Sequence, residues 1–181
     1  LAGAKLAAVV DVDQERAAVA GRRYGVPWFR DWRQITSRAD AAVVAVPTSA
    51  HAEVSCGLLE AGLDVLVEKP IAADLASAQR MVATARTCGR LLNVGHVESF
   101  NPAVAKLREI ARTPLFFEVH RLSPFTPRSL DIDVVLDLMI HDIEIVLALV
   151  GEEPVDAQAA GIAILSHKVD IANVRLTFST G

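Results

Sequence analysis

Two titratable side chains stand four positions apart inside a strongly apolar stretch of the sequence. Asp137 and His141 lie within residues 131–150, where most other positions are apolar. If this stretch is a helix, residues four apart share one face and can reach each other. A carboxylate beside an imidazole favours the protonated ring and fixes its orientation, which suits a general base. The alternative is a pair that serves only the structure. We expect Asp142 and Glu144 to face solvent or a domain interface.

A second candidate is the tripeptide Glu68-Lys69-Pro70, which follows the apolar residues 65–67. Charges at the end of a buried strand are costly unless they are paired or functional. A lysine here could stabilise negative charge on a reacting oxygen. A cis bond between Lys69 and Pro70 is plausible, because X-Pro bonds adopt cis far more readily than others. The alternative is a Glu–Lys pair on a solvated rim.

Asp11 ends another short apolar run. In dinucleotide-binding folds, an acidic residue at the end of the second strand accepts hydrogen bonds from the adenosine ribose and disfavours a 2′-phosphate. The glycine-rich loop that belongs about 20 residues upstream would fall before residue 1. We therefore expect NAD rather than NADP, in a chain truncated at both ends. Asp11 as a plain helix cap is the alternative.

Pro47 and Thr48 follow the next apolar run, and His51 comes shortly afterwards. The carboxyl edge of a parallel sheet is where ligands bind, so these residues are candidates for cofactor contacts. Thr48 could equally be an N-cap of the following helix. His51 could equally have a structural or surface role.

The elements that carry these residues alternate in the first half of the chain. Each expected helix has a polar cap at its start (Asp13, Thr48 or Asp74) and a glycine at its end (Gly25, Gly62 or Gly89). The expected strands are residues 6–10, 41–46, 65–67 and 91–94, and the expected helices are residues 13–24, 48–62 and 74–89. This alternation predicts a Rossmann-like, doubly wound parallel sheet without its first strand.

The pattern changes after about residue 97. We expect a short helix over 101–112, a strand over 115–122, a long buried helix over 131–150 and strands over 157–165 and 171–178. In the last strand Ala172, Val174, Leu176 and Phe178 alternate with polar residues, which indicates an antiparallel sheet with one wet face. The prediction is a partial dinucleotide-binding domain over 1–97 and a partial α+β domain over 98–181, with a ligand cleft between them.

Composition narrows the functional classes. The 181 residues are 52% hydrophobic and 22% charged, which favours a folded core. A net charge of −4 gives no footprint for nucleic acid or an anionic membrane, and no apolar run reaches the roughly 18 residues of a membrane span. Cys56 and Cys88 form no CxxC pair and have no nearby histidine, so we expect buried cytoplasmic thiols and no metal site.

Taken together, these residues resemble the Gfo/Idh/MocA oxidoreductases. Three features match in order: Asp11 at a strand end, the tripeptide at 68–70, and Asp137-x-x-x-His141-Asp142 on a long helix. A narrower resemblance is to the UDP-N-acetylglucosamine 3-dehydrogenase branch. It is carried by residues 93–102, 118–122 and 135–142, and Ser99 stands where that branch has arginine.

The resemblance implies hydride transfer between NAD and a secondary hydroxyl of a sugar or sugar nucleotide, at C3 of UDP-N-acetylglucosamine. His141 would be the base, Asp137 would hold it, and Lys69 would face the reacting oxygen. It implies cofactor contacts from Asp11 and Glu68, and substrate contacts from His96, Asn101 and Arg121, with the Arg121 fork as partner for a diphosphate. It also implies a homo-oligomer at full length. A redox-assisted glycosidase of the same fold and a non-catalytic nicotinamide-binding sensor remain the alternatives.

Overall fold

A computed structural model of the chain describes residues 3–112, 114–124 and 132–179. The chain divides into two compact units, Leu1–Val94 and Gly95–Gly181.

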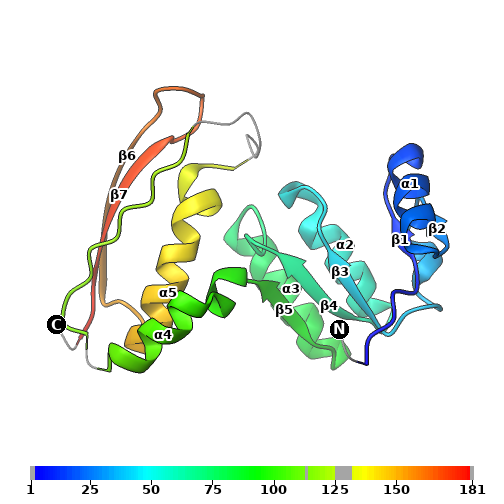
Figure 1. The fold of residues 1–181 in the computed structure, drawn as a ribbon, viewed down its shortest axis with the longest axis horizontal. Coiled ribbons are helices and arrows are strands. Elements are labelled where there is room, and N and C mark those ends of the chain that lie inside the picture. The colour runs from blue at the N-terminus through cyan, green and yellow to red at the C-terminus, as the bar shows by residue number, and fades with distance from the viewer. Residues whose placement is uncertain (1–2, 113, 125–131, 180–181) are drawn as a thin grey trace. The chain divides into compact units, whose positions relative to one another are not determined.

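The first unit begins with a small parallel pair of strands. β1 (Val9–Val10) pairs with β2 (Trp28–Phe29), and α1 (Gln14–Tyr24) connects them (Figure 1). Asp13 caps α1 and Gly25 ends it with a left-handed φ of 66°, as the sequence predicts. The predicted strand over 6–10 is confirmed only at its last two residues. β2 and the 3₁₀ helix η1 (Trp32–Ile35) were not predicted.

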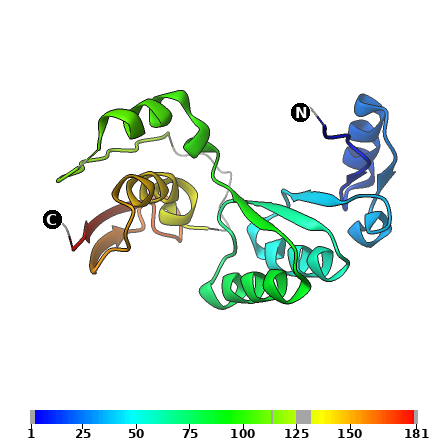
Figure 2. The same cartoon turned by 90° about the horizontal axis from the view of Figure 1, so that it is seen from below.

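The second sheet of this unit has the strand order β3-β4-β5. Its strands are β3 (Ala41–Val44), β4 (Asp64–Glu68) and β5 (Leu92–Gly95). β3 and β4 run parallel, with Val44 opposite Val67. The helices α2 (Thr48–Glu60) and α3 (Leu75–Cys88) pack against each other, and both lie along this sheet in Figure 2. The predicted parallel architecture is confirmed, but its strands form two short sheets rather than one.

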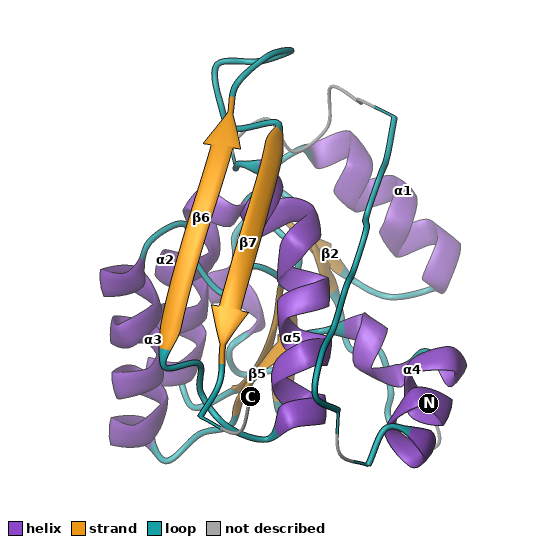
Figure 3. Cartoon of the chain, turned by 90° about the vertical axis from the view of Figure 1, so that its left-hand side faces the viewer, coloured by secondary structure: helices purple, strands orange, loops and turns teal. Residues whose placement is uncertain are grey.

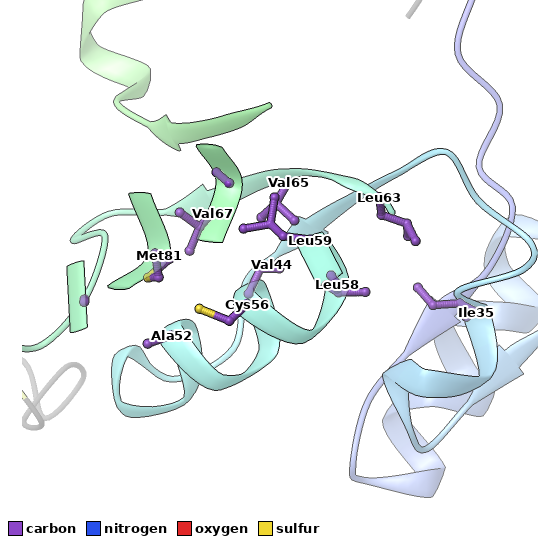
Figure 4. Close-up of a cluster of buried hydrophobic side chains, with 12 residues drawn as sticks. Ile35, Val44, Ala52, Cys56, Leu58, Leu59, Leu63, Val65, Val67 and Met81 are labelled. Carbon is purple, nitrogen blue, oxygen red and sulfur yellow. The ribbon is translucent and has the colours of Figure 1, made fainter. Parts of the chain in front are cut away.

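The core of the first unit lies where α2 and α3 meet the strands (Figure 4). Leu58, Leu59, Leu63, Val67 and Met81 are the large apolar side chains that are fully buried there. They pack α2 against β4, and this packing positions the turns that follow β3 and β4.

Thr48 does not cap α2, which corrects one prediction. Pro47 occupies the cap position, and no side chain accepts a hydrogen bond from the first turn. The carbonyl of Pro47 accepts from the backbone N–H of Ala50 at 2.8 Å, so the turn starts on backbone bonding. Thr48 is the first helical residue and is 8% exposed, so its side chain is packed against the unit.

The second unit opens with the short helices η2 (Val97–Phe100) and α4 (Pro102–Ile110), with Asn101 as the cap between them. Further along come a π-helical turn, η3 (Val135–Met139), and α5 (Ile140–Val150), which is continuous with it. Of the long predicted helix, Asp131 lies outside the described residues. Asp133 begins the helix instead, because its carboxylate accepts the backbone N–H groups of Val135 and Leu136, both at 3.0 Å.

Two strands close the second unit. β6 (Asp156–Ile162) and β7 (Ile171–Thr177) pair antiparallel, with opposed arrows in Figure 3. The predicted alternation is confirmed. Ala172, Val174 and Leu176 are half-buried, Phe178 is buried, and the residues between them are exposed.

Two other predictions for this unit are wrong. Residues 115–122 form no strand, because no described strand pairs with them to complete a ladder. The helix over 134–150 is not buried all round either, since none of its residues is fully buried. Part of its apolar surface instead lines a groove of about 1310 Å³, which residues 114–124 and β7 also line.

Candidate active site

The candidate residues of the first unit follow the carboxyl ends of its strands. Asp11 comes directly after β1, and Pro47 and Thr48 follow β3. Glu68 is the last residue of β4, and Lys69 comes directly after it. β3 and β4 are adjacent and parallel, so their two turns emerge at the same edge of the sheet. This edge is where open α/β sheets bind ligands.

Asp11 is held by local contacts. Its Oδ1 accepts from the backbone N–H of Asp13 at 2.8 Å and from Nη2 of Arg16 at 3.2 Å. Its side chain is 31% exposed. The capping role belongs to Asp13, whose Oδ1 accepts from Glu15 and Arg16 backbone N–H groups, with the Arg16 bond foremost in lowering the pKa of that carboxyl. Asp11 therefore does not cap α1.

The tripeptide forms a turn at the end of β4. The Lys69–Pro70 peptide bond is cis, as the sequence analysis considered plausible. Glu68 and Lys69 are both half-buried and Pro70 is fully buried. The two charged side chains therefore do not stand on a fully solvated rim.

His51 lies on α2 and is buried, with 1% of its surface exposed. Its Nδ1 is 2.9 Å from the carbonyl oxygen of Pro70, and its Nε2 is 2.9 Å from that of Val46. Both ring nitrogens thus meet backbone groups of the two turns. A surface role for this residue is excluded by its burial.

In the second unit, Asp137 lies inside the π-helical turn and His141 lies in the first turn of α5. The backbone N–H of Ile140 reaches back five residues to the carbonyl of Val135. A π turn holds one more residue than an α turn, so it changes the angle between the faces that carry Asp137 and His141. Such turns recur at functional sites in helices, and a hydropathy pattern does not signal them.

Arg121 is engaged by Asp142, the residue after His141. Nε of Arg121 lies 3.0 Å from each carboxylate oxygen, and Nη2 lies 2.7 Å from Oδ1. These bonds raise the pKa of Arg121 above its ordinary value. The Asp142 side chain is only 13% exposed, so it does not face solvent. The pair ties residues 114–124 to α5 and occupies part of the fork predicted to bind a diphosphate.

Ser99, which stands where the resembling branch has arginine, donates a hydrogen bond to Glu144. Nη2 of Arg108 lies 3.2 Å from the Ser99 hydroxyl and 3.8 Å from Glu144 Oε1. Arg108 therefore supplies a positive charge beside this carboxylate. Sequence reasoning missed Arg108 because it comes from another helix, nine residues away.

The other two predicted substrate residues, His96 and Asn101, lie close to Ser99 in the sequence. His96 immediately precedes η2 and is half-buried. Asn101 is the cap of α4: its Oδ1 accepts from the backbone N–H of Ala103 at 2.9 Å, and its Nδ2 donates to Glu98 at 3.2 Å. The groove of the second unit is lined by Arg121, Asp137 and Asp142 among others.

Lys69 belongs to the first unit, and Asp137 and His141 belong to the second. Their joint action stays a prediction. Among the residues that the structure describes, no group of three or more His, Cys, Asp or Glu side chains could hold a metal ion. Within the same ranges, no helix has the length and apolar character needed to cross a membrane.

The first unit has the architecture and the strand-end acid of a dinucleotide-binding domain. A family model described as an oxidoreductase family with an NAD-binding Rossmann fold matches residues 1–96. The chain belongs to this family, Gfo/Idh/MocA.

Individual proteins similar to the chain are also named as dehydrogenases. The chain is 38% identical to a UDP-N-acetylglucosamine 3-dehydrogenase of Acidithiobacillus ferrooxidans, over 98% of the chain and 57% of the relative. A crystal structure of the Acidithiobacillus dehydrogenase matches with a TM-score of 0.91, over 99% of the chain and 60% of that structure. An inositol 2-dehydrogenase of Saccharopolyspora erythraea is 32% identical over 88% of the chain and 50% of its own length. The chain thus spans between half and three fifths of these relatives.

Proposed function

We propose that the protein oxidises a secondary hydroxyl of a sugar nucleotide with NAD, and that C3 of UDP-N-acetylglucosamine is the reacting carbon. The observation that carries the proposal is the Glu68-Lys69-Pro70 turn at the ligand-binding edge of the sheet, in a member of an NAD-binding oxidoreductase family. The 38% identity to a UDP-N-acetylglucosamine 3-dehydrogenase supports the choice of substrate.

The first unit fits a dinucleotide at its strand ends. Both contacts of Asp11 use Oδ1, and its side chain is partly exposed, so its other oxygen can accept hydrogen bonds from ribose hydroxyls. Pro47, Thr48 and Glu68 would line the cofactor at the neighbouring turns. When bound, NAD supplies the hydride acceptor, and the protein binds and orients the reactants.

The chain's own residues would manage the proton and the charge. His141 would take the proton of the substrate hydroxyl, which contributes about 10²–10⁴-fold in rate for a positioned base. Asp137 would orient the ring and stabilise its cationic form. The Lys69 ammonium would stabilise negative charge that develops on the hydroxyl oxygen.

The second unit would bind the sugar nucleotide. His96 and Asn101 are proposed sugar contacts. Arg121 remains the proposed diphosphate contact. Asp142 holds its Nε and Nη2 edge, so Nη1 is the donor that would turn to the phosphate.

The test uses the full-length protein with NAD and UDP-N-acetylglucosamine, and it follows the absorbance of NADH. We expect Lys69→Ala and His141→Ala each to lower kcat by about 10²–10⁴-fold while calorimetry shows NAD still bound. Lys106→Ala is the matched control, because Lys106 is exposed and pairs with the exposed Glu109 across one turn of α4. Undiminished turnover in Lys69→Ala contradicts the proposal.

The same assay separates the alternatives. Turnover of myo-inositol in place of the sugar nucleotide would assign the substrate of the inositol relatives. Cleavage of a glycoside without net NADH would indicate redox-assisted lysis. NAD binding without turnover of any of these compounds would indicate a sensor.

A further inference from the structure

The buried ring of His51 connects two turns that are separate in the sequence. One ring nitrogen lies 2.9 Å from the carbonyl oxygen of Val46, two residues before Thr48. The other lies 2.9 Å from that of Pro70, directly after Lys69. The ring itself is 1% exposed. A single side chain therefore lies between the ends of β3 and β4.

This position matters because buried carbonyl groups need donors. An unsatisfied backbone group away from water costs as much as a lost hydrogen bond, so the ring stabilises a turn whose carbonyl accepts its N–H. A neutral imidazole donates from one nitrogen only, and the protonated ring donates from both. β3 and β4 are adjacent, with Val44 opposite Val67, and their ladder ends just before these turns. Beyond the ladder, the His51 ring lies within hydrogen-bond distance of a carbonyl in each turn.

We propose that His51 is a positioning residue: without touching NAD, it fixes the turn that carries Lys69 against the turn that carries Pro47 and Thr48. Its effect on catalysis rests on the proposed function. This proposal differs from a cofactor contact, because both polar atoms of the ring already face protein backbone and the ring is covered.

The first test needs no activity. We compare His51→Phe, which keeps a ring but removes both polar atoms, with Ser55→Ala as a matched control. Ser55 is equally buried on the same helix, one turn further on. Amide hydrogen exchange is measured over residues 46–50 and 68–72. We expect His51→Phe to speed exchange about tenfold in both segments, and Ser55→Ala to change neither. Unchanged exchange in both segments of His51→Phe overturns the link.

A second variant covers the case in which His51→Phe does not fold. His51→Gln keeps a side-chain N–H donor, and we expect it to recover protection in the turn that its amide reaches. Protection that is kept in at least one segment of His51→Gln but lost in both segments of His51→Ala supports a link through donors. Protection that is kept in both segments of His51→Ala overturns the link.

The functional test uses the full-length protein with NAD and UDP-N-acetylglucosamine. We expect His51→Phe to lower kcat by about tenfold with KM for the sugar nucleotide nearly unchanged, because Lys69 loses its support. The pH profile of kcat should keep its shape, and His51→Gln should restore part of the rate. A raised Kd for NAD with kcat intact would make His51 a cofactor contact and overturn the proposal. If the parent protein does not reduce NAD, the proposed function fails, and the exchange measurement still decides the link.

Discussion

Asp11 is the residue on which we propose that the choice between NAD and NADP depends. Its carboxylate lies beside the Arg16 guanidinium, 3.2 Å from Oδ1, so an anion and a cation meet where the adenosine ribose is proposed to bind. The carboxylate accepts hydrogen bonds from ribose hydroxyls and repels a 2′-phosphate, whereas an arginine attracts one. With Asp11 present, Arg16 pairs with two carboxylates, Asp11 at 3.2 Å and Asp13 at 3.8 Å.

We therefore expect Asp11→Ala to erode the preference for NAD. Loss of hydrogen bonds to a charged group weakens NAD binding by about 10–100-fold, and Arg16, left with Asp13 as its partner, favours NADP. The measurement is a calorimetric titration of the full-length protein with each nucleotide. Arg16→Ala is the control and should keep the preference of the parent. A ratio of the two Kd values that Asp11→Ala leaves unchanged would show that specificity lies elsewhere.

At the scale of elements, substitutions of Asn101 can distinguish a role as a helix cap from a contact with the substrate. Its Oδ1 caps α4, and its Nδ2 reaches Glu98. Asn101→Ala removes the cap and should lower the free energy of unfolding by about 1 kcal/mol, measured by denaturant titration. Asn101→Ser keeps a capping oxygen without placing a second carboxylate beside Glu98, and it should leave stability near that of the parent. A large loss of turnover in Asn101→Ser would then assign the amide to the substrate, whereas unchanged turnover would leave Asn101 a cap alone.

The loop between β6 and β7 is organised by one carboxylate. Asp170 accepts hydrogen bonds from the backbone N–H groups of Ile164, Leu165 and Ser166, and from the Ser166 hydroxyl. These bonds, with the Ile164 bond foremost, lower the pKa of Asp170 from 3.8 to about 2. Because the folded pKa lies below the ordinary value, the stabilisation is complete above about pH 4 and disappears as the pH falls through about 2.

We expect the amide signals of Ile164, Leu165 and Ser166 to shift together between pH 4 and pH 2 in NMR spectra. Asp170→Asn should expose the same amides to faster hydrogen exchange at neutral pH, because a neutral amide oxygen is a weaker acceptor. Asp156→Asn is the control, since its hydrogen bond is with the nearby Gln158 side chain. Signals that do not move in this range would mean that the loop is held by other contacts.

Local chemistry explains which elements the sequence could predict. Asp13 and Gly25 bound α1, and Asp74 and Gly89 bound α3, because caps act within a few residues. Thr48 was misassigned because Pro47 supplies a backbone start that competes with a side-chain cap. The pairing of Trp28 and Phe29 with β1 depends on residues far along the chain, and a two-residue strand has no period to detect.

In the candidate site, too, the sequence could predict some features and not others. Lys69 could be predicted because two charges after an apolar strand are conspicuous. The contacts of His51 and Arg108 could not, because each partner comes from another turn or helix and leaves no spacing pattern in the sequence. The π turn around Asp137 likewise arises from backbone geometry, and the residue types there are those of an ordinary apolar helix.

At the scale of the whole molecule, the two-stranded sheet of the second unit has an exposed face and exposed strand edges among the described residues. A two-stranded sheet is marginal alone, and its edges and open face can be covered by further strands of the same protein or by a second copy. Every residue of β6 is exposed. Most of the wet face is polar, with Asn173, Arg175 and Thr177 on β7. At one end, however, Ile162 and Ile171 lie opposite each other and are 55% and 57% exposed.

We predict that a second copy covers this pair of isoleucines, so that the full-length protein self-associates. Sedimentation velocity across a range of protein concentrations measures the oligomeric state. Ile162→Lys should shift the equilibrium toward the monomer, because the new charge would be desolvated in the interface. Leu75→Lys is the matched control, since Leu75 is 73% exposed at the start of α3 in the first unit. A monomer at every concentration would contradict self-association, and an oligomer indifferent to Ile162→Lys would move the contact to another surface.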